Sequence, residues 1–254
     1  MVHSSLNLTG KKALVTGSSR GIGRAIALAL AEHGADVLVH GIAPEGPGAE
    51  VVKAIQAMGR KSAFIAADLA AEEAPQSVHD QAMATLGAVD ILILNASVQI
   101  RNDWKLIPQA EYLTQMNVNF WASLALMQKF VPAMEAKGWG RVVTIGSVQQ
   151  QRPHPQMVIY SASKMAQMGL VRSLAKQLAP SGITVNNVAP GVIDTDRNKD
   201  VLADAAYLQQ VLAKIPVGFI GQVEDCTGAV LMLCGEAGRF TTGQDLLIDG
   251  GQSL

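Results

Sequence analysis

Short apolar runs alternate with longer helical patterns along the whole chain, and few folds accommodate that order of elements. The expected strands are residues 12–16, 37–40, 62–66, 89–94, 141–145, 184–188 and 245–248. The expected helices are residues 22–33, 49–58, 72–86, 109–135, 159–178 and 224–234. Continuous apolar strands are typical of a sheet that helices cover on both faces, and strand–helix–strand repetition favours parallel pairing. We therefore predict an α/β fold with a doubly wound, seven-stranded, mainly parallel sheet.

Composition is consistent with one large domain over residues 1–254. Of these 254 residues, 49% are hydrophobic and 16% are charged, so a large core can be buried. The formal net charge of −1 argues against nucleic acid or an anionic membrane as the main partner. No apolar run is as long as a membrane span requires, and the N-terminus lacks the pattern of a signal peptide, so we expect a cytoplasmic protein.

The cysteines and histidines predict neither a disulfide nor a metal site. Cys226 and Cys234 lie eight positions apart in one expected helix. That spacing separates them by about 12 Å along the helix axis, which is too far for a disulfide. We expect reduced thiols, as in the cytoplasm. The 5 histidines are scattered and neither residue type shows metal-ligand spacing, so no metal is expected.

A glycine-rich turn joins the first expected strand to the first expected helix. It reads Thr-Gly-Ser-Ser-Arg-Gly-Ile-Gly at positions 16–23. Glycine permits a sharp turn and close approach of a phosphate, which the free N–H groups of the following helix then bind. A tight turn without a ligand is the alternative interpretation. The dinucleotide-binding residues predicted here are Gly17, Ser19, Arg20, Gly21, Ile22 and Gly23.

The end of the second expected strand bears on the choice of nicotinamide cofactor. NAD-binding sites usually place a carboxylate there, against the ribose 2′-hydroxyl. Here the strand ends in Val-His-Gly-Ile at 39–42, without an acid. Arg20 would pair with a 2′-phosphate, although a solvated loop arginine explains it equally well. The sequence favours NADP(H), with NAD(H) as the alternative.

Polar residues also follow the third and fourth expected strands. Asp68, with Leu69 beside it, follows the third strand and is suited to accept a hydrogen bond from adenine. A helix N-cap is an equally good interpretation of Asp68. Asn95 begins a small polar turn after the fourth strand, beside the expected cofactor.

A serine, a tyrosine and a lysine form the candidate chemical centre. Ser147 follows the fifth expected strand, and Tyr160 and Lys164 lie four positions apart, on one face of the next helix. A phenol ordinarily has a pKa of roughly 10 and is a poor proton donor or acceptor near neutrality. A nearby ammonium stabilises the phenolate and so makes proton transfer effective.

These motifs together resemble the short-chain dehydrogenase/reductase family over essentially the whole chain. The glycine-rich turn, the Asn95-Ala96 turn, Ser147, Tyr160-x-x-x-Lys164 and Pro190-Gly191 occur in the family's order and approximate spacing. The resemblance implies a Rossmann fold and hydride transfer between NAD(P) and a secondary alcohol or ketone. One departure is Ser97, where many members carry glycine, and its Cβ is expected to narrow the site.

The resemblance also implies roles for individual residues. Tyr160 would be the acid/base, Ser147 would hydrogen-bond the substrate oxygen, and Lys164 would assist Tyr160 and hold the nicotinamide ribose. Asn119, with Asn117 as the fallback, would bind a water that links Lys164 to solvent. The segment beside the nicotinamide would contribute Pro190, Gly191, Ile193 and Thr195.

Two segments are expected to define the substrate pocket. The stretch after Ser147 is polar, and Gln149, Gln151, Arg152 or His154 would hydrogen-bond hydroxyls or a carboxylate of the substrate. A solvated loop is the alternative interpretation of this stretch. Residues 192–216 are long enough to close as a lid.

The remaining alternatives concern the substrate and the class of protein. Several segments resemble the 3-oxoacyl-carrier reductase branch, whereas the polar stretch suggests a sugar, polyol or hydroxy acid. A non-catalytic cofactor-binding regulator is a further alternative, disfavoured because Tyr160 and Lys164 are both present. The resemblance implies a homotetramer formed through the two longest helices, 109–135 and 159–178.

Overall fold

The protein was studied as a computed structural model that describes residues 4–254, apart from the side chains of residues 200–202. The first three residues of the expected domain therefore lie outside the described residues. One sheet has the strand order β3-β2-β1-β4-β5-β6-β7, and every pair in it is parallel. The predicted seven-stranded parallel sheet is confirmed. Its strands are β1 (Lys12–Val15), β2 (Asp36–Gly41), β3 (Ser62–Ala66), β4 (Ile91–Leu94), β5 (Gly140–Ile145), β6 (Ile183–Pro190) and β7 (Asp245–Ile248).

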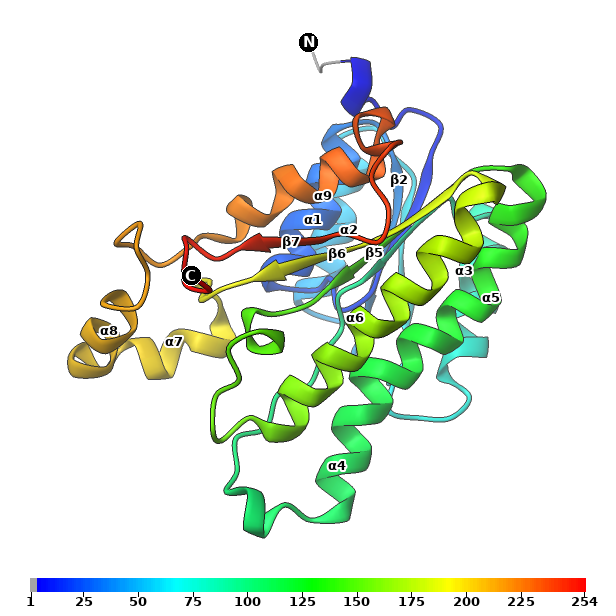
Figure 1. The fold of residues 1–254 in the computed structure, drawn as a ribbon. Helices are drawn as coiled ribbons and strands as arrows, with labels where there is room; N and C mark the ends of the chain where they lie inside the picture. The colour runs from blue at the N-terminus through cyan, green and yellow to red at the C-terminus, as the bar shows by residue number, and fades with distance from the viewer. Residues whose placement is uncertain (1–3) are drawn as a thin grey trace.

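Helices cover both faces of the sheet (Figure 1). One face carries α1 (Gly21–Glu32), α2 (Pro47–Ala57) and α9 (Thr227–Cys234). The other carries α3 (Ala74–Leu86), α4 (Gln109–Met116), α5 (Ala122–Lys137) and α6 (Val158–Leu178). Two further helices, α7 (Asp196–Leu202) and α8 (Ala205–Leu212), project beyond the end of β6 (Figure 1). Short turns of 3-10 helix occupy Ser4–Leu6, Trp104–Leu106, Val148–Gln150, Ala179–Ser181, Val223–Cys226 and Glu236–Gly238.

The two-sided core explains why the strands read as continuous apolar runs. In β1, Leu14 packs in the cluster with α3, α5 and α6, whereas Ala13 and Val15 pack with α1, α2 and α9. Successive side chains of a strand point to opposite faces, so a strand with helices on both sides needs apolar residues at every position. Residues of β1, β4 and β5 are accordingly buried throughout, apart from Lys12 at the start of β1.

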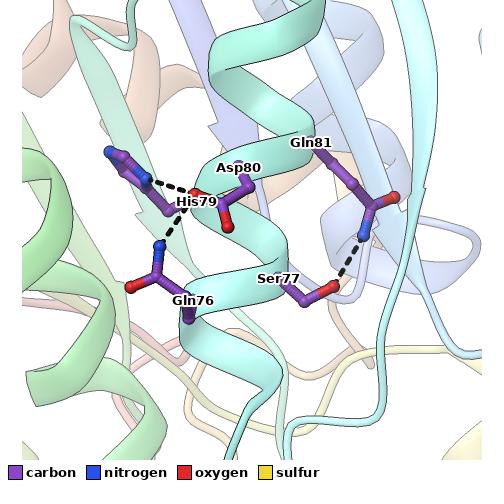
Figure 2. A network of polar contacts seen from close by, with 5 residues as sticks. All are labelled: Gln76, Ser77, His79, Asp80 and Gln81. Atoms are coloured by element: carbon purple, nitrogen blue, oxygen red, sulfur yellow. Dashed lines mark hydrogen bonds and ion pairs between the residues drawn. The ribbon is translucent and has the colours of Figure 1, made fainter.

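The outer surface of α3 is held by local polar contacts rather than by a capping side chain. Figure 2 shows the Asp80 carboxylate between Gln76 and His79, with Gln81 and Ser77 paired on another side of the helix. Gln76 and Asp80, and likewise Ser77 and Gln81, lie four positions apart, and such pairs stabilise a helix by only a few tenths of a kcal/mol, roughly 0.2–0.5. Hydrogen bonds from His79 and Gln76 lower the pKa of Asp80.

The long helix expected at 109–135 is interrupted in the structure. Between α4 and α5 the chain forms a π-helical turn, Asn117–Trp121. The Asn119 side chain at this turn is bonded to the backbone of Val98, which draws the helix toward the end of β4. Such single π-helical turns often occur at functional sites, and they carry no signature in hydrophobic periodicity.

The described residues include neither a membrane-spanning helix nor a metal-binding cluster. No described helix is long and apolar enough to cross a membrane. Residues 4–254 hold no group of at least 3 histidine, cysteine or acidic side chains placed to bind a metal ion. Cys226 and Cys234 are both free and buried, and burial raises the pKa of each thiol to about 12. Both are therefore protonated and unreactive near neutral pH.

Candidate active site

A cavity of about 570 Å³ opens at the carboxyl ends of the strands. Because β1 lies between β2 and β4 in the sheet, the strand order reverses direction there and leaves a crevice for a ligand. The cavity walls come from the turns after β1 to β6 and from the segment that carries α7 and α8. Among the residues predicted to bind cofactor, those that line the cavity are Gly17, Ser19, Arg20, Gly21, Ile22, Gly23, Asp68, Leu69, Asn95, Tyr160, Pro190, Gly191, Ile193 and Thr195.

The glycine-rich turn is built by backbone contacts that any bulkier residue would disturb. Gly17 has φ +62°, and a Cβ at this position would come within 2.9 Å of the Ala96 Cα. Its N–H donates to Nδ1 of His40 at 3.1 Å, and the Ser18 hydroxyl donates to the Val15 carbonyl at 2.7 Å. The turn delivers the chain to the N-terminus of α1, whose free N–H groups suit a phosphate.

β2 ends without a carboxylate, at Gly41, and the residue before it is His40. His40 is 2% exposed, and burial lowers its pKa to about 4, so the ring is neutral near pH 7. Because Nδ1 accepts from Gly17, the ring proton lies on Nε2, which has no hydrogen-bond partner among the described residues. Arg20 is exposed at the N-cap of α1 and lines this part of the cavity, as does Glu45.

Asp68 and Asn95 occupy the positions expected of them beside the cavity. One oxygen of Asp68 accepts from the Ala70 N–H, whereas α3 begins only at Ala74, so Asp68 is not the N-cap of that helix. The Asn95 amide donates to the carbonyls of Thr16 and Gly17, at 2.9 Å each, and ties the β4 turn to the glycine-rich turn. The cradle, which a Cβ at Gly17 would fill, fits a dinucleotide.

Ser147 presents a hydroxyl to the cavity directly after β5. Its Oγ accepts from the Gln149 N–H at 3.2 Å, which leaves the hydroxyl hydrogen free to donate. The Gln150 side chain turns inward and donates to Asp245 at 2.6 Å, while its oxygen accepts weakly from the Ser147 N–H. This buried contact holds the turn in place, and nothing in the local sequence distinguishes Gln150 from its neighbours Gln149 and Gln151.

Tyr160 and Lys164 lie together on the first turns of α6. Tyr160 lines the cavity, and the described residues offer its hydroxyl no hydrogen bond. Lys164 is 1% exposed, with its Nζ 5.8 Å from the centre of the Tyr160 ring and 2.6 Å from the Ile145 carbonyl oxygen. Burial, followed by the positive charge of Arg197, lowers the pKa of Lys164 to about 7. The ammonium is thus held beside the phenol without a neutralising carboxylate.

A buried chain of polar contacts links Lys164 to the π-helical turn. Lys164 donates to Gln167, Gln167 donates to the Ser123 hydroxyl, and Ser123 donates to the Asn119 carbonyl. Sequence reasoning missed Gln167 and Ser123, although the three-residue spacing from Lys164 to Gln167 on α6 was a usable signal.

Asn119, rather than the fallback Asn117, is the asparagine that points into the protein. It is fully buried, and its amide donates to the Val98 carbonyl and to Ser163 while its oxygen accepts from the Val98 N–H. These bonds use both amide hydrogens, so the side chain joins the β4 turn to α6. A role of Asn119 in holding water stays a prediction.

The buried Lys164 should make stability depend on pH. The unfolded chain holds this proton up to its ordinary pKa of 10.5, whereas the folded protein releases it near pH 7. Between those values the unfolded state binds more protons, so stability rises with pH. We expect the unfolding free energy to rise by about 2 kcal/mol from pH 7 to pH 9, measured by urea denaturation of the cofactor-free protein.

Two variants test whether Lys164, rather than another titrating group, causes the rise in unfolding free energy between pH 7 and pH 9. Lys164→Met should remove the rise, whereas Lys176→Met, an exposed lysine on the same helix, should leave it unchanged. A Lys164→Met protein with the wild-type pH dependence would contradict the expectation.

The polar stretch after Ser147 divides between the cavity and the protein surface. Gln149 and His154 line the cavity, and the Gln149 oxygen accepts from the His154 N–H at 2.6 Å. Gln151 instead donates to Asp245, and Arg152 donates to the carbonyls of the last two residues of the chain. The structure therefore does not bring Arg152 to the cavity, because the chain terminus folds back against it.

The expected lid contributes a contact that explains Ser97. Arg197, on α7, donates to the Ser97 hydroxyl at 3.2 Å and to the Ser97 carbonyl at 2.9 Å. Ser97 thus holds the segment that carries α7 through these hydrogen bonds, and it also lines the cavity.

Several cavity residues had no signal in the sequence. Besides Arg197, they include Gln99, Arg101, Tyr207, Lys214 and Gln252. The Gln252 oxygen is buried without a partner among the described residues. Arg197 lies on α7 and Tyr207 on α8, and the others come from loops and the chain terminus, where no periodicity marks a functional position.

The family model described as enoyl-(acyl carrier protein) reductase matches residues 17–253. A 3-oxoacyl-[acyl-carrier-protein] reductase of Haemophilus influenzae is 36% identical over 247 residues, which are 97% of this chain and 100% of that protein. The chain belongs to the short-chain dehydrogenase/reductase family. An L-rhamnose 1-dehydrogenase (NAD(P)(+)) of Sphingomonas is 33% identical over 96% of each chain.

A solved structure of another protein has nearly the same fold as this chain. A 3-oxoacyl (acyl-carrier-protein) reductase of Agrobacterium tumefaciens, crystallised with NADP bound, has a TM-score of 0.94 and 39% identity, covering 99% of this chain and 97% of that one. The expected Rossmann fold and the family resemblance are confirmed. This short-chain dehydrogenase/reductase is therefore an oxidoreductase that acts between alcohols and carbonyl compounds.

Proposed function

We propose that the enzyme interconverts a secondary alcohol and a ketone, with Tyr160 as acid/base, Ser147 as hydrogen-bond donor and Lys164 as the supporting cation. The observation that carries the proposal is the burial of the Lys164 ammonium beside Tyr160, in a site where Ser147 and Tyr160 line the same cavity. A buried cation without a carboxylate partner is costly, which favours a catalytic reason for its presence.

The nicotinamide, when bound, supplies the hydride in reduction and accepts it in oxidation. Tyr160 donates its hydroxyl proton to the carbonyl oxygen in reduction, or takes the alcohol proton in oxidation. Ser147 has a free hydroxyl hydrogen with which to hold that oxygen. Lys164 favours the phenolate that remains, because opposite charges attract strongly in a dry site. Asn119 acts indirectly, by fixing Val98 and Ser163.

The experiment that tests this function follows nicotinamide absorbance with NADPH or NADH against ketones, keto acids, oxoacyl thioesters and ketoses. The reverse direction is measured with the corresponding alcohols. Turnover with at least one carbonyl compound is expected, and it should disappear in Tyr160→Phe. Tight cofactor binding without any turnover would favour a non-catalytic, cofactor-binding protein instead.

Arg20 supports a preference for NADP(H). It lines the cavity together with the end of β2, where no acid is present, and no described residue pairs with its guanidinium. A charge-assisted pair with a 2′-phosphate contributes roughly 1.5–3 kcal/mol.

We expect Arg20→Ala to lower kcat/KM for NADPH by about 10- to 100-fold, because one charged hydrogen-bonding partner is lost. The value for NADH should change less than about twofold, since NADH has no 2′-phosphate. Arg24→Ala is the matched control, because Arg24 is exposed one turn later and does not line the cavity. An equal fall in kcat/KM for NADPH and for NADH would show that Arg20 does not bind the 2′-phosphate.

Two substrate classes remain within this function. The similarity to 3-oxoacyl reductases supports an oxoacyl thioester. The polar wall formed by Gln99, Gln149 and Tyr207 supports a sugar, polyol or hydroxy acid instead, because these side chains can bind several hydroxyls.

We also propose that residues 192–216 act as a lid and that the enzyme is a cytoplasmic homotetramer. The lid is supported by the Arg197–Ser97 contact across the cavity. Assembly through α4, α5 and α6 is supported by exposed apolar side chains on α4, on α6 and on the π-helical turn between α4 and α5, namely Tyr112, Val158, Met165 and Trp121. Light scattering would measure the assembly mass. The free, buried cysteines are compatible with a reducing compartment.

A further inference from the structure

Three basic side chains from separate segments line the cavity. Arg101 follows β4, His154 follows β5, and Lys214 follows α8, and all of them line the cavity that holds Tyr160. Burial, and then the charges of Arg101 and Lys214, lower the pKa of His154. Three separate segments thus bring basic side chains close together.

No carboxylate neutralises this group in the described part of the chain. The described ion pairs join His79 to Asp80, Lys137 to Asp90 and Arg141 to Glu236. Arg101 and Lys214 take part in none of them. The acids that line the cavity are Glu45 and Asp68, near the ends of β2 and β3, and Asp196, on the first turn of α7. Like charges that converge without a partner destabilise a protein, so a bound anion is the natural complement.

His154 is oriented to add a neutral donor to these cations. Its ring Nδ1 accepts from the Gln156 N–H at 3.1 Å, and its backbone N–H donates to the Gln149 side-chain oxygen at 2.6 Å. The neutral ring therefore carries its proton on Nε2. A neutral donor flanked by an arginine and a lysine is well suited to a carboxylate.

We propose that the substrate carries a carboxylate close to its reacting carbon and that Arg101, Lys214 and His154 bind this group. The proposal rests on the proposed function and names its substrate class. The cations and Tyr160 line one cavity, which supports a carboxylate and a reacting carbon on one small molecule. A thioester on a carrier has its nearest phosphate many bonds from the carbonyl, at the far end of a flexible arm, and fits this arrangement less well. Arg197, already fixed on Ser97, adds positive potential beside Lys164.

The test compares acids with neutral partners of the same shape. Isothermal titration measures binding of D-gluconate and D-glucitol, L-tartrate and L-threitol, and acetoacetate and methyl acetoacetate to the enzyme saturated with NADP⁺. Turnover of each pair is measured in parallel, with acetoacetyl-CoA as the phosphate-bearing thioester. At least one acid should bind more than about 10-fold tighter than its neutral partner, the value of two exposed charge contacts.

Charge-removing variants assign that preference to the named residues. Arg101→Gln and Lys214→Gln should each weaken binding of the acid by about fivefold and leave its neutral partner unchanged. Lys199→Gln is the matched control, since Lys199 is an exposed lysine on α7 outside the cavity. The proposal is overturned when no acid binds better than its neutral partner, when the variants weaken both equally, or when only acetoacetyl-CoA responds to them. Failure of the proposed function is distinct, because it requires that no carbonyl compound, charged or neutral, is turned over in a Tyr160-dependent way.

Discussion

Replacement of Tyr160 by phenylalanine is expected to lower kcat by about 10²- to 10⁴-fold, the usual contribution of a positioned acid/base. The hydroxyl faces the cavity, and the described residues give it no hydrogen bond, so its loss leaves no buried partner unsatisfied. Phenylalanine keeps the ring that packs beside Lys164. The folded protein should therefore remain intact, and the loss should fall on proton transfer.

The measurement combines steady-state kinetics with NADPH binding by fluorescence titration. The variant should bind NADPH within about twofold of wild type, because the cradle at the other end of the cavity is untouched. Tyr112→Phe is the control, since Tyr112 is 45% exposed on α4 and lies outside the cavity. A Tyr160→Phe enzyme that keeps kcat within tenfold of wild type would assign the proton transfer to another group.

Replacement of Gly23 by alanine is expected to disable cofactor binding. A Cβ at Gly23 would lie 2.4 Å from the Asn95 amide nitrogen and 2.4 Å from the Gly17 carbonyl oxygen. Both distances are far shorter than a van der Waals contact. The Gly17 oxygen belongs to the backbone, so it cannot move aside as a flexible side chain can. Asn95 would be displaced from Thr16 and Gly17, to which it donates at 2.9 Å each. The glycine-rich turn would then lose the conformation that presents N–H groups to a phosphate.

We expect the affinity for NADPH to fall by about 10- to 100-fold in Gly23→Ala, the value of one charge-assisted hydrogen bond. Overpacking should also lower the unfolding free energy by about 1–3 kcal/mol. Fluorescence titration and urea denaturation measure the two effects. Gly228→Ala is the matched control, because a Cβ there meets nothing within 4 Å and Gly228 lies in a helix. Wild-type NADPH affinity in Gly23→Ala would show that the turn tolerates the displacement.

Much of the candidate site was predictable because its residues follow strands. The carboxyl ends of parallel strands meet at one edge of a sheet, so Gly17, Asp68, Asn95 and Ser147 had to converge once the strands were recognised. The family resemblance then supplied roles for Tyr160 and Lys164. These predictions needed only local patterns and the order of elements along the chain.

The predictions that did not reach the cavity came from the loops. Gln149, Gln150, Gln151 and Arg152 are adjacent and similarly polar, yet one lines the cavity and the others bond to Asp245 or to the chain terminus. A 3-10 turn, Val148–Gln150, sends neighbouring side chains in different directions. Polarity alone cannot resolve those directions, because each partner lies about a hundred positions away in the sequence.

Hydrophobic periodicity was sufficient to predict the seven strands, and residue spacing was sufficient to predict the turn at 16–23 and the shared helix face of Tyr160 and Lys164, since each depends on residues a few positions apart. Other features depend on which distant segments come together. Folding alone excludes water from Lys164 and lowers its pKa to about 7, places Arg197 on Ser97 across 100 positions, and gathers Arg101, His154 and Lys214 in one cavity. Burial and charge proximity are properties of three-dimensional packing, and a linear sequence does not contain those distances.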